Sequence, residues 1–307
     1  RALFLAGEPD TLSPTPIHYV KSNEIRHDVW FPYIRELGGV YIGVGSDQNY
    51  TLIATARAQL VFLLDIDINV VRLHRVYEAL IEASEDPETL LQRWHEDSRE
   101  ESVALLEQAF ADLDEEDRKR LIRQYKASRE TVYRHLRIVI RRTRGGQATS
   151  WLSNPDLYAH IRTLYQRDRV RMMGGDLTGS SALKAAGDAA KALELPVKVL
   201  YLSNAEEYFK YVETYRENVR NLPVEDDSVV LRTIYSKEWV HADNLWGYQV
   251  QRLTDFQARL TDLSYRSRNT LFRLAEKEGV LDRETGVKGL SLIGAGLERP
   301  DADDKQE

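Results

Sequence analysis

Residues 38–74 read GGVYIGVGSDQNYTLIATARAQLVFLLDIDINVVRLH, and this stretch decides the fold. An apolar run at 40–42 stops at a glycine turn, Gly43-Val44-Gly45, and a second apolar run at 60–64 ends at an acid, Asp65. The residues between the two runs suit a helix. Strand, glycine turn, helix, strand and terminal acid follow one another in half of a Rossmann nucleotide-binding unit. The stretch therefore predicts a βαβ unit with a ligand site at the carboxyl ends of its strands.

The glycines and acids of this stretch predict where a nucleotide would bind. Gly43 and Gly45 would let the backbone approach a ligand where a Cβ would collide. A carboxylate such as Asp65 or Asp67 would accept hydrogen bonds from ribose hydroxyls. Carboxylates avoid the ends of buried apolar strands unless something binds them, which favours a ligand. The third glycine of a full dinucleotide fingerprint is absent, so a βαβ unit without a ligand is the alternative.

Composition excludes several classes of protein and site. The chain has 307 residues, 42% hydrophobic and 30% charged, which suits one large globular domain or two smaller ones. It has no cysteine, which excludes disulfides, thiolate metal sites and cysteine nucleophiles and suits a cytoplasmic location. No apolar run approaches the roughly 20 residues of a membrane span, and the first residues lack a signal-peptide pattern. The net charge of −7 argues against nucleic acid as a partner.

The rest of the chain alternates helices with strands. Residues 1–22 predict an irregular arm. Helices are predicted at 24–37 (with a break at Pro32), 70–81, 90–94, 103–113, 121–140, 180–193, 205–219 and 250–278, and further strands at 170–173, 197–202 and 228–235. A parallel crossover needs one helix, so the additional helices predict an inserted cap. The units predicted are 1–84 (the arm and the first part of a Rossmann-like domain), 85–150 (the cap), 151–298 (the rest of that domain) and 299–307 (a disordered tail).

The predicted fold is α/β, with a Rossmann-like, mostly parallel sheet, helices on both faces and a helical insertion after the second strand. Polar side chains fall at the end of each predicted strand. Because the carboxyl ends of parallel strands lie at one edge of a sheet, these side chains predict a single cleft. They are Asp47 to Asn49, Asp65 and Asp67, Asp176, Ser203-Asn204, and Tyr235 to Asp243.

These residues resemble the class I S-adenosylmethionine (SAM) dependent methyltransferases over residues 38–75 and 168–235. Gly43-Val44-Gly45 is similar to that family's first motif, whose glycine turn lies under the methionine part of SAM. Asp65 matches the acid that holds the ribose hydroxyls, and Asp176-Leu177 resembles the pair that contacts adenine. Ser203-Asn204 lies at the fourth strand end, where the family commonly places its transfer chemistry. The resemblance implies SAM as the cofactor.

The chain departs from that family at two places in the first motif. Tyr41 stands where an acid usually meets the methionine amino group, and Asp47 replaces the third glycine. The chain is more similar to uncharacterised bacterial methyltransferase-like proteins that combine an SNE segment, here 22–24, with a first motif of the VYIGVGSDQNYT type. In such a branch Asp47, Gln48 or Asn49 is expected to hold the amino-acid end of SAM.

Three side chains are candidates for the transfer chemistry, which needs an aligned nucleophile and sometimes a base. Asn204 could orient an acceptor, or only cap a helix. His241 could act as a base near neutral pH, or be an ordinary core or surface histidine. Tyr248, with two neighbouring tryptophans, could form an aromatic wall, or simply pack in the core. Glu206 is a weaker candidate, because a first-turn carboxylate is common in helices.

The predicted function is a SAM-dependent methyltransferase that acts on a small molecule. Alternatives are transfer of the aminocarboxypropyl group of SAM, a nicotinamide-dependent oxidoreductase, and a non-catalytic scaffold that keeps the fold. No metal is expected, because His74 and His95 lack a metal-binding spacing, although a site at Asp65, Asp67 and His74 is conceivable. The arginines of 129–144 suggest a solvated helix face or a docking site for an anionic substrate.

Overall fold

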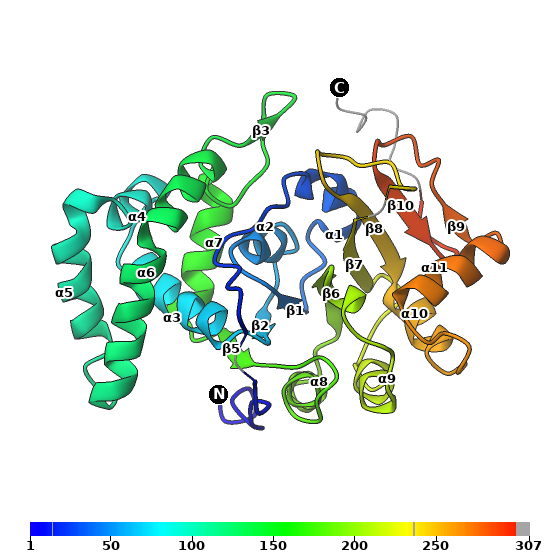
Figure 1. The fold of residues 1–307 in the computed structure, drawn as a ribbon, viewed down its shortest axis with the longest axis horizontal. Coiled ribbons are helices and arrows are strands. Elements are labelled where there is room, and N and C mark those ends of the chain that lie inside the picture. Colours follow the sequence, from blue (N-terminus) through cyan, green and yellow to red (C-terminus); the bar gives the residue numbers. More distant parts are fainter. Residues whose placement is uncertain (14, 236, 299–307) are drawn as a thin grey trace.

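The computed structural model describes residues 1–13, 15–235 and 237–298, and its main sheet has eight strands (Figure 1). In their order across the sheet the strands are β5 (Val170–Gly174), β2 (Leu60–Asp65), β1 (Val40–Val44), β6 (Val197–Ser203), β7 (Val229–Ile234), β8 (Gly247–Arg252), β10 (Leu290–Ile293) and β9 (Leu281–Asp282). The strands from β5 to β7 are parallel, β8 runs antiparallel to β7, and β9 runs antiparallel to β10. The chain order reverses between β1 and β6, which is where ligands bind in open α/β sheets.

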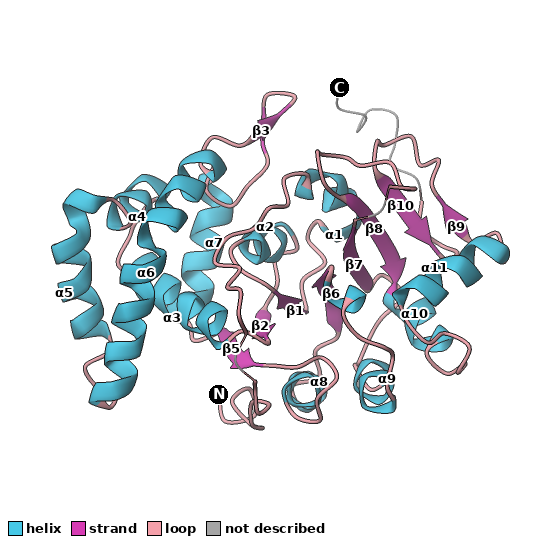
Figure 2. Ribbon diagram, viewed as in Figure 1, coloured by secondary structure: helices cyan, strands magenta, loops and turns pink. Residues whose placement is uncertain are grey.

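Helices cover both faces of this sheet (Figure 2), so the predicted Rossmann-like fold is confirmed. One face carries α2 (Gln48–Thr55), α3 (Ile68–Glu82) and α7 (Pro155–Gln166), and the other carries α8 (Ala182–Ala192), α9 (Glu213–Arg220), α10 (Leu253–Arg259) and α11 (Arg268–Lys277). Successive strand side chains point to opposite faces, so Tyr41 joins the first core and Ile42 the second.

A helical insertion follows the second strand, as predicted. It contains α4 (Pro87–Arg93), the 3-10 turn η2 (Glu96–Ser98), α5 (Arg99–Ala109), α6 (Glu115–Val139) and a hairpin of β3 (Thr143–Arg144) and β4 (Gln147–Ala148). Trp94, Tyr125 and Leu136 of this insertion are buried in the same core as Tyr77 of α3. The sheet and the insertion therefore share one continuous core on this face. Helix α7, which the sequence pattern did not predict, begins after its N-cap Asn154.

The N-terminal arm, residues 1–13 and 15–26, crosses the molecule near the carboxyl ends of the strands (dark blue in Figure 1). It leads into the 3-10 turn η1 (His27–Trp30) and the short helix α1 (Phe31–Ile34). The helix predicted at 24–37 is therefore wrong in length. Pro32 lies in the first turn of α1, where its missing N–H is tolerated, and Arg35 leaves the helical conformation at ψ 122°.

The single helix predicted at 250–278 is instead the end of β8 followed by two helices, α10 and α11. Its first residues form β8, in which Gln249 and Gln251 are fully buried because both accept hydrogen bonds from the buried Arg232, at 2.9 and 2.8 Å. A buried polar pair of this kind hides the strand from a search for apolar runs. The helix predicted at 205–219 is likewise split into the 3-10 turn η3 (Ala205–Glu207) and α9. The tail predicted at 299–307 lies outside the described residues.

Candidate functional site

The glycine turn after β1 is shaped by its own side chains. A Cβ on Gly43 would lie 2.1 Å from Oδ1 of Asn49, and a Cβ on Gly45 would lie 2.3 Å from Nε2 of Gln48. Gly45 also has a φ of +88°, which favours glycine. The Tyr41 hydroxyl donates to Oδ1 of Asn49 at 2.8 Å. Gln48 and Asn49, which were predicted to hold a ligand, are buried, and their side chains pack against the glycine turn.

Asp65 connects the glycine turn to the end of β2. Its carboxylate accepts hydrogen bonds from the backbone N–H of Gly45 at 3.0 Å and from that of Asp67 at 2.8 Å. Burial raises the pKa of Asp65 to about 6, against the effect of these two hydrogen bonds. Its side chain is half-buried, and a carboxylate has lone pairs for further donors. Asp65 can therefore still receive a ligand hydroxyl.

Asp67 is occupied differently from Asp65. Its carboxylate caps α3 by accepting from the backbone N–H of Asn69 at 2.9 Å, and it also accepts from Nδ1 of His18 in the arm at 2.7 Å. The side chain of Asp67 is buried. The two acids at the end of β2 thus have different roles. Asp65 bonds to the glycine turn, whereas Asp67 caps α3 and binds the arm.

Asp47 joins the glycine turn to the helical insertion. Its buried carboxylate accepts from Nε2 of His135, on α6, at 2.8 Å, and from the backbone N–H of Ser22 at 3.4 Å. Burial raises the pKa of Asp47, but the charge and hydrogen bond of His135, together with Arg142, outweigh burial and hold that pKa below its usual value. Sequence reasoning missed His135, since its 88-residue separation from Asp47 gives no local signal.

Glu24 of the arm gathers the ends of β6 and β7. It is 2% exposed, and its carboxylate accepts hydrogen bonds from the hydroxyls of Ser203 at 2.6 Å, Tyr201 at 2.8 Å and Thr233 at 3.1 Å. Nε2 of His27 lies 3.3 Å away. Glu24 was also missed, although it lies in the SNE segment of the sequence. Three converging hydroxyls from two neighbouring strands indicate that the arm is an integral wall of this region.

The fourth strand end holds Ser203 and Asn204. Ser203 has a φ of +48°, an uncommon conformation for a residue other than glycine, at a break in the pairing of β6 with β7. The Asn204 amide lies 3.4 Å from Glu207 and Tyr208 and is half-buried. Of the three catalytic candidates, Asn204 is the one whose side chain stays open to solvent next to the switch point between β1 and β6.

Glu206 lies in a buried network on the other face of the sheet. It forms an ion pair with the fully buried Arg232. It also accepts hydrogen bonds from the hydroxyls of Tyr211 at 2.7 Å and Tyr215 at 2.9 Å. The Glu206 carboxylate therefore has all its partners within the core, and we interpret Glu206 as a structural residue.

Tyr248 is held by Asp243 and by the backbone of the arm. The Tyr248 hydroxyl donates to Asp243 at 2.7 Å and accepts from the backbone N–H groups of Ile25 and Arg26 at 3.0 and 2.9 Å. Burial raises the pKa of Tyr248 well above its usual value. His241 instead stacks on Tyr235, with ring centroids 6.2 Å apart. Tyr248 thus anchors the arm.

The aromatic wall expected around Tyr248 is divided between two places. Trp246 donates from Nε1 to the side chain of Asn23 at 3.2 Å, on the arm. Trp239 packs against Phe272 of α11 and under the guanidinium of Arg283. These aromatic residues therefore do not line a common surface.

The arm also reaches the end of β5. Asp10 accepts hydrogen bonds from the backbone N–H groups of Asp176 at 3.2 Å and Ser181 at 2.9 Å. Asp176 itself accepts from the N–H and the hydroxyl of Thr178, at 2.8 and 2.7 Å. Leu177 is buried in the core with α8. Asp176 remains half-buried and Leu177 contributes apolar surface from within.

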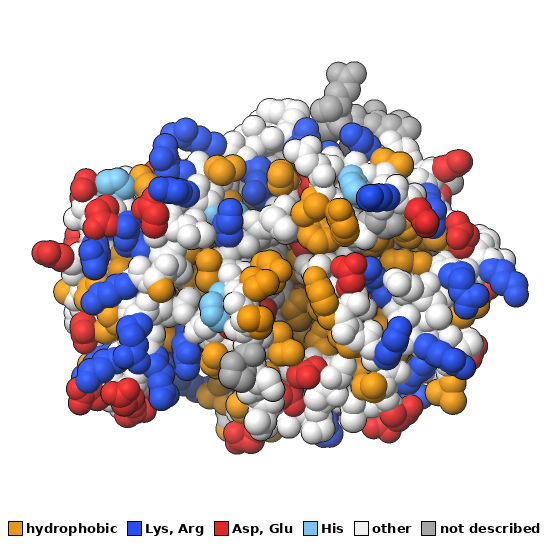
Figure 3. Space-filling view, in the orientation of Figure 1, with side chains coloured by type: hydrophobic (Ala, Val, Ile, Leu, Met, Phe, Trp, Pro, Cys, Tyr) orange, Lys and Arg blue, Asp and Glu red, His pale blue; other side chains and the backbone are white. Residues whose placement is uncertain are grey.

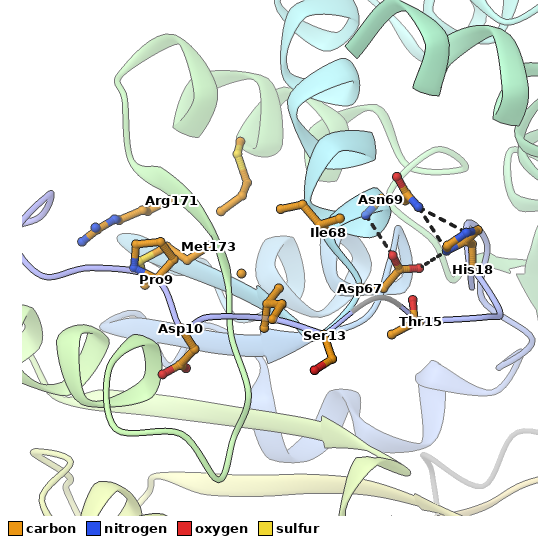
Figure 4. Close-up of a pocket in the computed structure, with 13 residues that line it drawn as sticks. Pro9, Asp10, Ser13, Thr15, His18, Asp67, Ile68, Asn69, Arg171 and Met173 are labelled. Carbon is orange, nitrogen blue, oxygen red and sulfur yellow. Dashed lines mark hydrogen bonds and ion pairs between the residues drawn. The ribbon is translucent and has the colours of Figure 1, made fainter. Parts of the chain in front are cut away.

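A cavity of about 750 Å³ lies beyond the ends of β2 and β5, under the arm (Figure 4). His18, Asp67 and Asn69 form a hydrogen-bonded group on one side of it, and Met173 and Arg171 lie on the other. The lining of the cavity includes Asp67, two residues after Asp65, and Gly174, two residues before Asp176. It therefore adjoins the two positions at which the resemblance expects ribose and adenine.

A second depression lies over the switch point. In the space-filling view (Figure 3) the surface is hollowed near its centre, over the ends of β1 and β6, and hydrophobic side chains surround the hollow. Large exposed hydrophobic side chains lie on the arm and after β2, β6 and β7; they are Ile17, Tyr19, Ile25, Ile66, Ile68, Tyr208 and Tyr235. An apolar rim around polar strand ends is typical of small-molecule sites.

The remaining sequence predictions concern the arginines of 129–144, a metal site and a membrane span. Arg129 is buried and pairs with Glu96 and Glu130, and Arg134 pairs with Glu130. Within the described ranges, no group of three or more histidine and acidic side chains is placed to hold a metal. Across the same part of the chain, no helix has both the length and the apolar character needed to span a bilayer.

Fold and site together define a Rossmann-like α/β protein with a glycine turn and an acid at the switch edge of its sheet. The chain matches a domain of unknown function, DUF7790, over residues 19–294, and it belongs to that family. No curated protein matches it. Two solved structures of the rRNA methyltransferase AviRa from Streptomyces viridochromogenes resemble it, each with 10% identity over 74% of this chain and 79% of that chain, with TM-scores of 0.32 and 0.31.

Proposed function

We propose that this protein is a SAM-dependent methyltransferase with a small-molecule acceptor. The observation that carries the proposal is the hydrogen bond of Asp65 to Gly45, which places a half-buried carboxylate beside the glycine turn at the switch point. A ribose hydroxyl can also donate a hydrogen bond to that carboxylate, because the backbone N–H groups of Gly45 and Asp67 leave some of its lone pairs unused. The glycine turn then lies where the resemblance expects the methionine part.

The two depressions support this placement of the ligand. The adenosine part is proposed to extend from Asp65 toward Asp176 and Leu177, with the cavity beside Asp67 and Gly174 receiving the base. The sulfonium end is proposed to lie in the hollow near Ser203. Asp47, Gln48 and Asn49 are proposed to act by shaping the turn, since their polar groups are already bonded within the chain.

Asn204 is proposed to orient the acceptor, because its amide faces solvent beside the hollow. Methyl transfer from a sulfonium mainly requires a positioned nucleophile and the exclusion of water. His241 remains a proposed base, and Tyr248 is proposed to contribute by holding the arm. The apolar rim favours an acceptor with an apolar or aromatic surface.

Calorimetry with SAM, S-adenosylhomocysteine and NAD tests the proposal. We expect both sulfur compounds to bind and NAD to fail. Absence of binding by SAM and S-adenosylhomocysteine at millimolar concentration would contradict it. If SAM binds, release of S-adenosylhomocysteine supports methyl transfer, whereas methylthioadenosine indicates transfer of the aminocarboxypropyl group.

A second candidate is a non-catalytic protein that keeps the fold. It is favoured by the saturation of Glu24, Tyr248 and Asp47 by contacts within the chain. In that case a ligand binds without turnover, or none binds. Single-turnover assays with an extract of small metabolites and radiolabelled SAM distinguish the two, because only the transferase moves label from SAM to an acceptor.

A further inference from the structure

We propose that a groove between α3, α6 and the arm binds the phosphate group of a small molecule. The groove has a volume of about 600 Å³. Its polar lining includes His18, Asn69, Arg72, Arg120, Arg123 and Gln124. It shares His18 and Asn69 with the cavity beneath the arm, so the two spaces are neighbours. This inference does not depend on SAM binding.

Positive charge in the groove is only partly balanced by nearby acids. Three arginines line it and no carboxylate does, although the chain carries a net charge of −7. Arg123 has no ion pair within the described part of the chain, and Arg72 donates to the neutral Asn69 at 3.2 Å. Arg120 pairs with Asp117, but both are exposed, and such a pair contributes little free energy. All three guanidinium groups can therefore turn toward an anion.

Gln124 adds a polar amide to the lining of the groove. The residue is 8% exposed, and its side-chain amide makes no hydrogen bond to another described residue but keeps contact with solvent. The amide is therefore free to donate to a ligand in the groove. A phosphate oxygen in the groove would accept a hydrogen bond from this amide. The same oxygens suit the planar forks of the arginines.

Helical spacing explains how the groove forms. Arg120, Arg123, Gln124 and Ala127 recur at three- and four-residue intervals, so they lie on one face of α6. The small side chain of Ala127 leaves room between this face and Arg72 of α3. The space is comparable to known small-molecule sites rather than to an extended polynucleotide track. Together with the acidic chain, this favours a small phosphate ester over nucleic acid.

The test measures binding of inorganic phosphate and of ribose 5-phosphate by calorimetry. The unaltered protein should bind both at one site with millimolar or tighter affinity. The double variant Arg72→Gln/Arg123→Gln should bind at least about tenfold more weakly, since hydrogen bonds to charged groups contribute this much. Arg141→Gln is the matched control, because Arg141 is exposed on the segment after α6 and outside the groove. Its affinity should change by less than about twofold.

Thermal unfolding of both variants controls for folding, and we expect unchanged melting of the double variant. Equal weakening by the control and the double variant would overturn the proposal, as would absence of binding to the unaltered protein. So would affinity that rises steadily with the length of a single-stranded RNA, because that result indicates a nucleic-acid surface. The double variant should bind SAM as the unaltered protein does, which keeps this result separate from the transferase proposal.

Discussion

The carboxylate of Glu24 accepts a hydrogen bond from the hydroxyl of Ser203 at 2.6 Å, across 179 residues of chain. Ser203 lies at the end of β6, beside the switch point, and Glu24 lies in the arm. The hydroxyls of Tyr201 and Thr233 complete the contact. This relationship makes the arm part of the site, and one buried side chain joins the arm to the ends of two strands.

Replacing Glu24 should release the arm without unfolding the sheet. In Glu24→Ala, backbone amides of 15–26 should exchange with solvent at least about tenfold faster, because the arm loses its buried anchor. Hydrogen exchange followed by mass spectrometry measures this rate. Glu8→Ala is the control, since Glu8 is exposed on the same arm. Unchanged exchange in the Glu24 variant would show that other contacts suffice.

His135 should be essential for stability because it is the side-chain partner of the buried Asp47. His135→Leu should lower the free energy of unfolding by about 3 kcal/mol, since it leaves a buried carboxylate without that partner. Denaturant titration measures the loss. Adding Asp47→Asn should recover part of it. His95→Leu should have a smaller effect, because His95 pairs with the exposed Asp97. A double variant no more stable than His135→Leu would contradict this account.

His74 should make the protein acid-sensitive. Burial lowers the pKa of His74 to about 4, and its ring bridges the Tyr50 hydroxyl and the Gly45 carbonyl. The unfolded chain takes up a proton below about pH 6.5 while the folded chain does not, so stability falls as pH decreases from about 6.5 to about 4. The loss due to His74 should reach about 3 kcal/mol.

Unfolding titrations at about pH 7 and about pH 4.5 check this expectation. His74→Gln should be less stable at neutral pH, but should lose less stability on acidification than the unaltered protein. Equal acid-induced losses in the two proteins would assign the effect to other groups.

SAM binding should strengthen as pH rises through the pKa of Asp65, which burial raises to about 6. Only the ionised carboxylate accepts from both ribose hydroxyls, and this form dominates above about pH 6. Affinity should therefore increase between about pH 5 and about pH 7 and then level off. Asp65→Asn should bind weakly with little pH dependence. Calorimetry with SAM across this pH range tests the expectation. If Asp65→Asn bound SAM as tightly as the unaltered protein, ribose binding at Asp65 would be excluded.

Glu206 should behave as a structural residue. Glu206→Gln should lower the free energy of unfolding by about 3 kcal/mol, because Arg232 loses its charged partner in the core. Glu213→Gln, which alters an exposed acid of α9 that pairs with Arg220 at the surface, should cost less than about 1 kcal/mol. Thermal and denaturant unfolding measure both. A Glu206→Gln variant with normal stability but no turnover would instead support a catalytic role.

The local sequence pattern was sufficient to predict most strands of the parallel sheet. The segments that became β1, β2, β5, β6 and β7 are mostly apolar, and a glycine or an acid stands at or just after the end of β1, β2 and β5. The amphipathic periods of α3 and α6 were equally clear. The pattern failed at β8, where Gln249 and Gln251 are buried against Arg232. Such polar pairing across strands replaces the apolar run on which sequence reasoning depends.

By itself, then, the sequence determined the parallel strands, the helical insertion and the glycine turn with its acid, because these depend on neighbours along the chain. The tertiary structure decided which polar side chains stay open to a ligand. It paired Asp47 with His135, Glu24 with Ser203 and Tyr248 with the arm, and left Asp65 and Asn204 half-buried. The physical reason is that a buried polar group takes whichever partner the fold brings within hydrogen-bonding distance, and residues more than 80 positions apart give no sequence signal of that meeting.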